Sequence, residues 1–319
     1  MVKNKILEYF FCNNKQATLS FFAKEFNVSR NACWLAINKL VEDGYDIKSD
    51  GKKGYIYFDN DKLSAVEINQ YCNNFKCIEV LNSVDSTSNY LKRLDILSTN
   101  IIVASDEQTS GRGQRGKNFL SKKGNGAYFT IYLKESFDID DIKYITICSA
   151  VAIRRCLHEL YKIDVDIKWL NDIFYKNKKL GGILTEVTVN AEEHSVSEIY
   201  VGIGINTLRV DDEIEDIAIS IEEISGNKVN RSQLIANVVN YFDQVFMILK
   251  QGESMKILNE YKLYQFIIGK KVLVREAEVE YTATVDSINN DAMLVVNANG
   301  IIKVLNNATI RVKEVQNES

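Results

Sequence analysis

The 319-residue chain contains no proline. An average usage of about 5% would give roughly 16 in a chain of this length. Proline normally marks loops and helix ends, so boundaries here have to be predicted from glycine, polar caps and apolar periodicity. No function follows from the absence itself.

Paired cysteines and long apolar runs are absent as well. The six cysteines include no CxxC pair, and four of them lie in apolar-patterned segments where a reduced thiol behaves as a small hydrophobic side chain. This pattern indicates neither a zinc site nor a disulfide framework. Charges interrupt each apolar run before it could span a bilayer, and the first residues lack a signal-peptide cleavage pattern. We expect a cytoplasmic protein without a membrane partner.

The length exceeds the usual size of a single hydrophobic core, and 46% apolar with 26% charged residues is a globular composition. We predict an α/β (α+β) multidomain protein with a head at 1–60, a linker helix at 61–78, a core at 79–266 and a β-domain at 267–319. The head has nine Lys or Arg against seven Asp or Glu, a net charge of +2, whereas the rest of the chain has a net charge of −6. That asymmetry indicates nucleic-acid binding only in combination with a motif.

The head has such a motif. An apolar helix pattern over residues 2–10 is followed by a second helix, for which we expect Ser20 as N-cap. A two-residue-wide apolar stripe from Ser29 to Val41 predicts a third helix, with Gly44 as its C-terminal stop. Residues 46–58 flank a DGKKG turn, which indicates a hairpin. Together these elements predict a winged helix-turn-helix.

The third helix of the head has side chains that could enter a major groove. The expected DNA-contacting residues on it are Ser29, Arg30, Asn31, Trp34 and Asn38. Lys52 and Lys53, at the hairpin tip, would meet phosphates. A small helical packing module is the alternative, because helix-turn-helix patterns also arise by chance.

Beyond a linker helix, strand-like and helix-like segments alternate to about residue 265, which predicts an α/β core. The expected strands are 77–84, 101–106, 126–133, a pair around a turn at 176–179 and one ending at 206. The expected helices start at Ser86 and at about 142 and 232. The tail from 267 to about 315 has short strands with turns at 289–291 and 299–300, which predicts a small β-barrel.

The most informative segment is QTSGRGQRG, Gln108 to Gly116, followed by Lys117. Glycines alternating with arginines let a backbone fold closely around an anion while the guanidinium groups neutralise its charge. The segment is neither a Walker loop nor a dinucleotide fingerprint, because GxxxxGK[ST] is absent and a polar stretch follows it instead of a helix. A flexible surface loop is the alternative to a phosphate site.

Two further segments point to the same chemistry. Lys168 begins KWLND at the end of an alternating strand, and burying such a lysine is costly unless it meets an anion. The hairpin continues into KLGGIL at Lys179–Leu184. In GIGIN, Gly202–Asn206, small residues permit close ligand approach and the amide can bond to a base edge.

These segments, with STSN at Ser86–Asn89 ahead of them, resemble the biotin protein ligase family motifs Q-x-x-G-R-G-R-x-G-R, K-W-P-N-D, K-x-x-G-I-L and G-I-G-I-N. Repressor-type members of that family also have a winged head and a small SH3-like C-terminal β-barrel. The resemblance implies an ATP-dependent enzyme that forms biotinyl-5′-AMP and transfers biotin to a lysine of a biotin carboxyl carrier protein. It also implies magnesium with the ATP, operator DNA as a partner and a homodimer.

The resemblance also assigns roles to residues. Biotin would contact Ser86, Thr87, Asn89, Gln108, Gly181, Gly182 and Ile183. ATP or the adenylate would contact Gly111, Arg112, Gly113, Arg115, Gly116, Lys117, Phe119 and Asn206. Lys168 and Arg112 would be catalytic: Lys168 would bridge the biotin carboxylate and the α-phosphate and offset developing charge. Asp172 would be the carboxylate nearest magnesium.

The chain departs from the family pattern at four positions. Gln114 replaces the second arginine, Lys117 the third, Phe119 a tryptophan and Leu170 the proline. Gln114 matters most, because an amide cannot make the charged, forked contact of arginine with a phosphate.

Two other functions remain open. A lipoyl-protein ligase-like enzyme would share the core and the adenylate chemistry, but a pocket with Ser86, Thr87 and Gln108 favours a ureido ring. A transcription factor that binds an effector without catalysis would not need a carboxylate-activating lysine, so Lys168 favours an enzyme.

Overall fold

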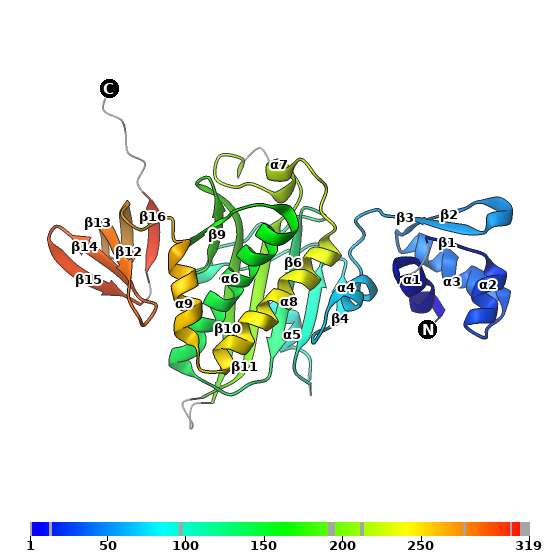
Figure 1. Cartoon of the computed structure of the whole chain (residues 1–319), viewed down its shortest axis with the longest axis horizontal. Helices are drawn as coiled ribbons and strands as arrows, with labels where there is room; N and C mark the ends of the chain where they lie inside the picture. Colours follow the sequence, from blue (N-terminus) through cyan, green and yellow to red (C-terminus); the bar gives the residue numbers. More distant parts are fainter. Residues whose placement is uncertain are drawn as a thin grey trace.

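The computed structural model describes residues 2–12, 15–95, 98–190, 195–210, 214–276, 279–306 and 308–312. Its elements form a small head, a large central body and a small all-β unit, with the head and the all-β unit at opposite ends (Figure 1). The expected α/β multidomain architecture is confirmed. None of the described helices is long and apolar enough to cross a membrane.

The head is the predicted winged helix-turn-helix. Three helices, α1 (Val2–Cys12), α2 (Leu19–Glu25) and α3 (Arg30–Glu42), pack against a sheet of order β1-β3-β2, with β1 at Gln16–Ala17, β2 at Asp46–Ser49 and β3 at Tyr55–Phe58. The head has its own core around Phe10, Phe22 and Leu40.

One boundary in the head differs from the prediction. Thr18, rather than Ser20, caps α2, because its side chain accepts from the Phe21 amide at 3.1 Å. Ser29 caps α3 in the same way, with the Ala32 amide as donor at 3.1 Å. Both residues are hydroxyl side chains in extended backbone just before the first helical residue, where unpaired amides need an acceptor.

The linker helix is shorter than expected. It spans only α4 (Ala65–Tyr71), capped by Ser64, whereas the prediction had extended the helix over residues 61–78. Residues from Lys76 already belong to the first strand of the central sheet. Apolar residues recur along the whole stretch, but Cys77 is buried in the first strand of the sheet and Ile78 is exposed there.

Hydrogen bonds tie the head and linker to the central body. The Tyr45 hydroxyl donates to Ser64 Oγ at 3.0 Å, and the Ser64 amide donates to Ser232 Oγ at 3.0 Å. Arg231, only 4% exposed, pairs with Asp106 at 2.7 Å and with Asp61 at 3.2 Å. A buried arginine with two carboxylates thus joins the linker to the end of a central strand.

The central body is one mixed sheet of order β4-β5-β6-β11-β10-β9-β8, with β7 paired to β11. Among the described strands of this sheet, β4 and β5 are the one parallel pair. The strands are β4 (Lys76–Leu81), β5 (Ile101–Ser105), β6 (Gly126–Leu133), β7 (Phe137–Asp138), β8 (Asp166–Lys168), β9 (Asp172–Tyr175), β10 (Lys178–Asn190) and β11 (Ser195–Asn206).

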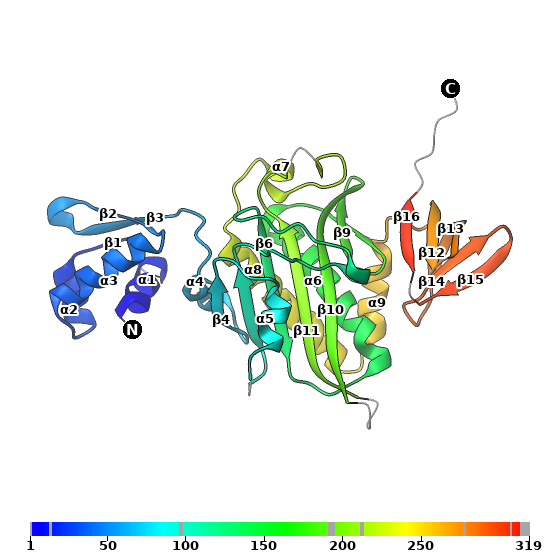
Figure 2. The ribbon, with the colours of Figure 1, turned by 180° about the vertical axis from the view of Figure 1, so that it is seen from behind.

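Helices α6 (Ile142–Tyr161) and α8 (Arg231–Lys250) cover one face of this sheet, with α9 (Ser254–Leu263) beside them (Figure 1). The opposite face has only the short α5 (Thr87–Lys92), so much of it is left to loops (Figure 2). The short α7 (Ile221–Ser225) lies at one end of the sheet. The strands and helices expected from alternation in the sequence are thereby confirmed.

The C-terminal unit is a five-stranded antiparallel sheet of order β15-β14-β13-β12-β16. Its strands are β12 (Lys271–Glu276), β13 (Val279–Ile288), β14 (Leu294–Ala298), β15 (Ile301–Leu305) and β16 (Thr309–Val312). The expected turns are present: Asn299 and Gly300 both adopt positive φ. Closure of this sheet into an SH3-like barrel stays a prediction.

Candidate active site

A pocket on the α5 face of the central sheet collects the three informative segments. It is lined by the loop at 112–119, by residues from Lys168 to Asp172, by the start of β10 and by the glycine-rich end of β11. The C-terminal unit adds one wall through Ala308, Thr309 and Ile310. Segments far apart in sequence therefore meet at one site, as the resemblance implied.

One end of the pocket is a network of hydroxyl and amide groups. Gln108 Oε1 accepts from the Thr87 amide at 2.9 Å, and Gln108 Nε2 donates to Ser121 Oγ at 3.1 Å. Thr130 Oγ1 lies 2.8 Å from Thr87 Oγ1 and 3.0 Å from Ser88 Oγ. These side chains are held by one another and by buried backbone, so the polar end is organised without a ligand.

The loop after β5 is folded on itself. Gln108 N donates to Ser121 O at 3.0 Å, Phe119 N to Gly111 O at 2.8 Å and Gly113 N to Lys117 O at 2.7 Å. A Cβ on Gly111 would lie 2.4 Å from the carbonyl oxygen of Phe119, so only glycine fits there. At least one glycine of this glycine-rich loop, Gly111, is therefore required by the backbone packing.

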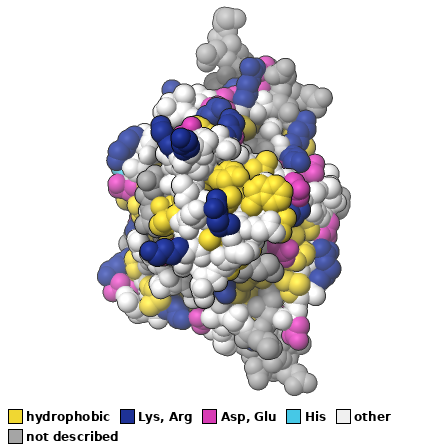
Figure 3. Space-filling view, turned by 90° about the vertical axis from the view of Figure 1, so that its right-hand side faces the viewer, with side chains coloured by type: hydrophobic (Ala, Val, Ile, Leu, Met, Phe, Trp, Pro, Cys, Tyr) yellow, Lys and Arg dark blue, Asp and Glu magenta, His cyan; other side chains and the backbone are white. Residues whose placement is uncertain are grey.

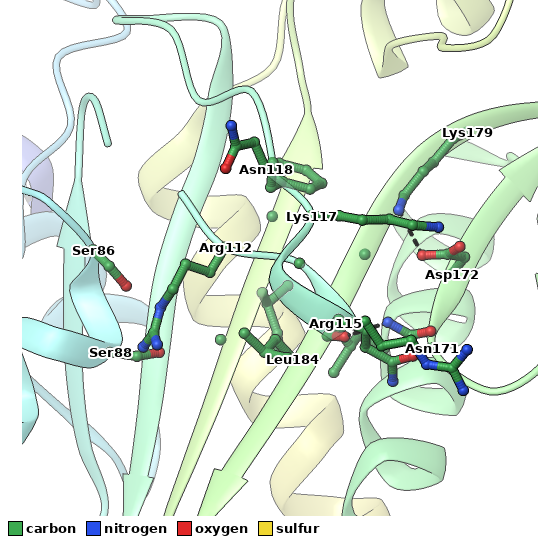
Figure 4. A pocket seen from close by; sticks show the side chains of 18 of the residues that line it. Ser86, Ser88, Arg112, Arg115, Lys117, Asn118, Asn171, Asp172, Lys179 and Leu184 are labelled. Carbon is green, nitrogen blue, oxygen red and sulfur yellow. Dashed lines mark hydrogen bonds and ion pairs between the residues drawn. The ribbon is translucent and has the colours of Figure 1, made fainter. Parts of the chain in front are cut away.

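Cations gather at the other end. Lys117, Lys168 and Lys179 line the pocket, and Lys179 Nζ pairs with Asp172 Oδ1 at 2.6 Å (Figure 4). Lys168 is half-buried, with its ammonium 5.3 Å from the centre of the Phe174 ring. Desolvation lowers the pKa of Lys168, the Asp172 carboxylate opposes that shift, and the neighbouring cations add to it. Such a site gains by binding an anion.

Two arginines of the loop point in different directions. Arg112 Nη2 donates to Asn89 Oδ1 at 2.6 Å and to Glu186 Oε2 at 3.1 Å, on the same side of the pocket as Ser86 and Ser88 (Figure 4). Arg115 instead reaches the C-terminal unit, where its Nη1 donates to Thr309 Oγ1 at 2.5 Å. Gln114, between them, is exposed and lines the pocket.

The residues assigned from sequence divide into two groups. Those that line the pocket are Ser86, Thr87, Gln108, Arg112, Gly113, Arg115, Lys117, Phe119, Lys168, Asp172, Gly182 and Ile183. Asn89, Gly111, Gly116, Gly181 and Asn206 are not part of its lining. Asn89 acts through its bond to Arg112.

Asn206, which we expected to contact adenine, is engaged with the protein instead. Its Nδ2 donates to the carbonyl oxygen of Ile219 at 3.1 Å, and its side chain lines a separate small pocket with Leu120 and Tyr128. The main pocket also has lining residues to which the sequence assigned no role, among them Ser88, Asn171, Lys179 and Thr309. Lys179 belonged to the KLGGIL segment, so its charge next to a glycine pair was the available signal.

The DNA-contacting residues assigned from sequence lie on the surface of the head. Ser29, Arg30, Asn31, Trp34, Lys52 and Lys53 are exposed, and Asn38 is half-buried. The end of the molecule that includes the head shows apolar side chains with Lys or Arg and Asp or Glu side chains around them (Figure 3). The Ser29 hydroxyl accepts from the Ala32 amide and caps α3.

Known proteins match the chain in two parts. Residues 80–206 match the biotin/lipoate A/B protein ligase family, and residues 2–56 match a helix-turn-helix domain. The bifunctional ligase/repressor BirA of Bacillus subtilis is 29% identical over 293 residues, covering 88% of this chain and 89% of that protein. The protein of the same name from Escherichia coli is 24% identical over 71% of each chain.

A solved structure shares the fold. The biotin protein ligase from Aquifex aeolicus, in complex with biotin and ATP, superposes with a TM-score of 0.67 and 24% identity. The match covers 75% of this chain and all of the other.

Proposed function

We propose that this chain, whose residues 80–206 match the biotin/lipoate A/B protein ligase family, activates biotin with ATP and transfers the biotin to a lysine of a carrier protein. The carrier is a biotin carboxyl carrier protein, and the intermediate is biotinyl-5′-AMP. This assignment makes the chain a biotin–[biotin carboxyl carrier protein] ligase.

The observation that carries this proposal is the polarity of the pocket. A connected set of hydroxyl and amide groups around Thr87 and Gln108 lies at one end, and three lysines lie at the other. The ureido ring of biotin offers one acceptor and two donors to the first end. The carboxylate of biotin and the phosphates of ATP are anions, which suit the second end. The dithiolane of lipoate has no N–H or C=O group, so it would lose the hydrogen bonds that a ureido ring can make with this set, at a cost in affinity.

In the first step the protein contributes by binding and by electrostatic stabilisation of charge. A carboxylate oxygen of biotin attacks the α-phosphorus, a new O–P bond forms, and pyrophosphate leaves with the electrons of the broken bond. Lys168 opposes the charge that gathers on the phosphate, and the loop around Arg112 and Lys117 holds the anion in line. In the second step a carrier lysine attacks the acyl carbon and AMP leaves.

Magnesium enters this proposal with ATP. Among the described residues no group of three or more His, Cys, Asp or Glu side chains could hold a metal ion, so a protein cage does not fit. Asp172 faces the cationic end of the pocket and is the carboxylate that fits an ion held mainly by phosphates. When bound, magnesium would neutralise phosphate charge.

The helix-turn-helix head supports a second role, as a biotin-responsive repressor. Arg30 and Asn31 of α3, with the wing lysines Lys52 and Lys53, would contact operator DNA. A homodimer would place two heads on the half-sites of a palindrome.

Acid specificity tests the ligase proposal. Pyrophosphate release is measured with ATP and either biotin or lipoate as the acid. We expect release with biotin and at least 100-fold lower kcat/KM with lipoate. The reverse preference would make the protein a lipoyl-type ligase, and ATP-independent binding of biotin with no release would make it a sensor.

A further inference from the structure

The Arg112 guanidinium belongs to a chain of charges at the edge of the pocket. Glu186, on β10, lies between two cations: its Oε2 is 3.1 Å from Arg112 Nη2 and its Oε1 is 2.9 Å from Lys92 Nζ. Lys92, on α5, also lies over the Tyr200 ring, 5.4 Å from its centre. Neither Glu186 nor Lys92 was among the site residues expected from the sequence.

The side-chain hydrogen bonds of Arg112 use one nitrogen of its guanidinium group. Both Asn89 and Glu186 accept from the same nitrogen, Nη2. No other described residue accepts from Nε or Nη1, so these donors remain available to a ligand. An arginine anchored at one nitrogen by two acceptors has lost most of its rotational freedom before the ligand arrives.

The charges at this edge are arranged so that Arg112 keeps a net attraction for anions. Glu186 is shared by two cations, which leaves the trio with one positive charge. Its side chain is 20% exposed, less than the 39% of Arg112 and the 34% of Lys92. Glu186 is therefore the most buried of the three side chains and lies on a strand, whereas Arg112 lies on a loop.

We propose that Glu186 is a positioning residue for the reaction, which holds Arg112 toward the junction of the acid and the α-phosphate. The inference rests on the proposed adenylation and deepens it. Glu186 itself touches no substrate and transfers no proton. Its effect is to hold the loop arginine ready on a rigid strand, so that less order has to be created in the transition state.

The alternative is an ordinary surface ion pair, which contributes little to stability and nothing to rate. If Glu186 acted only through its charge, its neutral variant should bind the substrates more tightly, whereas a positioning role predicts a loss of rate. Removing the negative charge of Glu186 raises the local charge from +1 to +2, which would strengthen the binding of anionic substrates. A loss of rate in a neutral variant therefore separates positioning from both alternatives.

The test is a mutant cycle on pyrophosphate release. Glu186→Gln keeps the shape of the side chain, and we expect kcat to fall about 10-fold with KM for biotin changed less than two-fold. Glu186→Asp, which restores the charge, should recover part of the loss. In an Arg112→Met background the same Gln substitution should have no further effect, because its target is gone.

Glu198→Gln is the matched control. Glu198 lies on β11 and bonds to the hydroxyls of Tyr132 at 2.9 Å and Tyr200 at 3.1 Å, outside the pocket lining. Its loss should lower the melting temperature without changing kcat. An unchanged kcat in Glu186→Gln, or an equal loss in both Arg112 backgrounds, would overturn the inference.

The outcome is separable from the proposed function. If the wild-type protein uses lipoate and not biotin, the biotin assignment fails and the same cycle is measured with lipoate. ATP affinity, measured by calorimetry without any acid, gives a third cycle. Glu186→Gln should change the Kd for ATP when Arg112 is present and leave it unchanged in Arg112→Met; no coupling in that cycle would count against the inference.

Discussion

Replacing Lys168 with alanine is the substitution with the largest expected effect on rate. The ammonium is half-buried at the cationic end of the pocket, where desolvation already disfavours its charge. Two unit charges about 4 Å apart interact with about 4 kcal/mol at an effective dielectric constant of about 20. Losing one preorganised charge contact of this kind costs about 2.7 to 4 kcal/mol, which lowers kcat about 100-fold to 1,000-fold.

The assay is pyrophosphate release under saturating ATP and biotin, with a melting curve to show that the variant is folded. Lys176→Ala is the control, because Lys176 is exposed in the turn between β9 and β10. We expect near wild-type release from the control. Near wild-type release from Lys168→Ala as well would refute the role assigned to that lysine and direct attention to Lys179, whose ammonium pairs with Asp172.

The pKa of Lys168 adds a pH test. Since desolvation lowers that pKa below the usual 10.5, the unfolded chain binds more protons than the folded one between the two values. Stability of the ligand-free protein should therefore rise with pH across that window, and kcat/KM should fall as the free enzyme loses its cation. Both trends should disappear in Lys168→Ala; an alkaline limb that persists there would assign the titration to another group.

Three further predictions concern other parts of the chain. Gln114 cannot make a charged, bidentate contact with a phosphate, and Arg115 beside it is bonded to the C-terminal unit. The wild-type protein should therefore release adenylate and label bystander lysines faster than Gln114→Arg. Equal labelling of a non-substrate protein by the two would contradict this. Arg30→Ala with Lys52→Ala should weaken operator binding in a gel-shift assay and leave pyrophosphate release unchanged, whereas equal loss of both activities would argue against a separate head. Arg231→Met leaves two partly buried carboxylates unpaired and should lower the free energy of unfolding by about 3 to 5 kcal/mol in denaturant titration; a change under about 1 kcal/mol would show that the junction is solvated.

Hydrophobic periodicity and short motifs in the sequence were enough to predict most of the helices and strands. The apolar stripe ending at Leu40 and Val41 predicted α3, where Leu40 is buried but Val41 is exposed. The apolar run GAYFTIYL predicted β6, and every residue of that strand is buried. The linker helix was overextended because no glycine or proline marks its end after Tyr71. Thr18 was missed as a cap because Ser20, two residues later, has the same chemistry.

The sequence could predict only those site residues that lie in short contiguous motifs. Gln108 and Lys168 lie in recognisable motifs, and both line the pocket. Glu186 and Thr309 come to the same place through strand register and the docking of the C-terminal unit, which no local pattern encodes. Asn206 illustrates the reverse: the motif is present, but its amide is bonded to Ile219.

The central claim is tested most directly by transfer of label to a carrier. The protein is incubated with ATP, magnesium, radiolabelled biotin and a purified biotin carboxyl carrier domain, alongside the same domain with its acceptor lysine replaced by arginine. The account predicts ATP-dependent label on the first domain and not on the second. No label on either domain, from folded protein with ATP and biotin in excess, would contradict it.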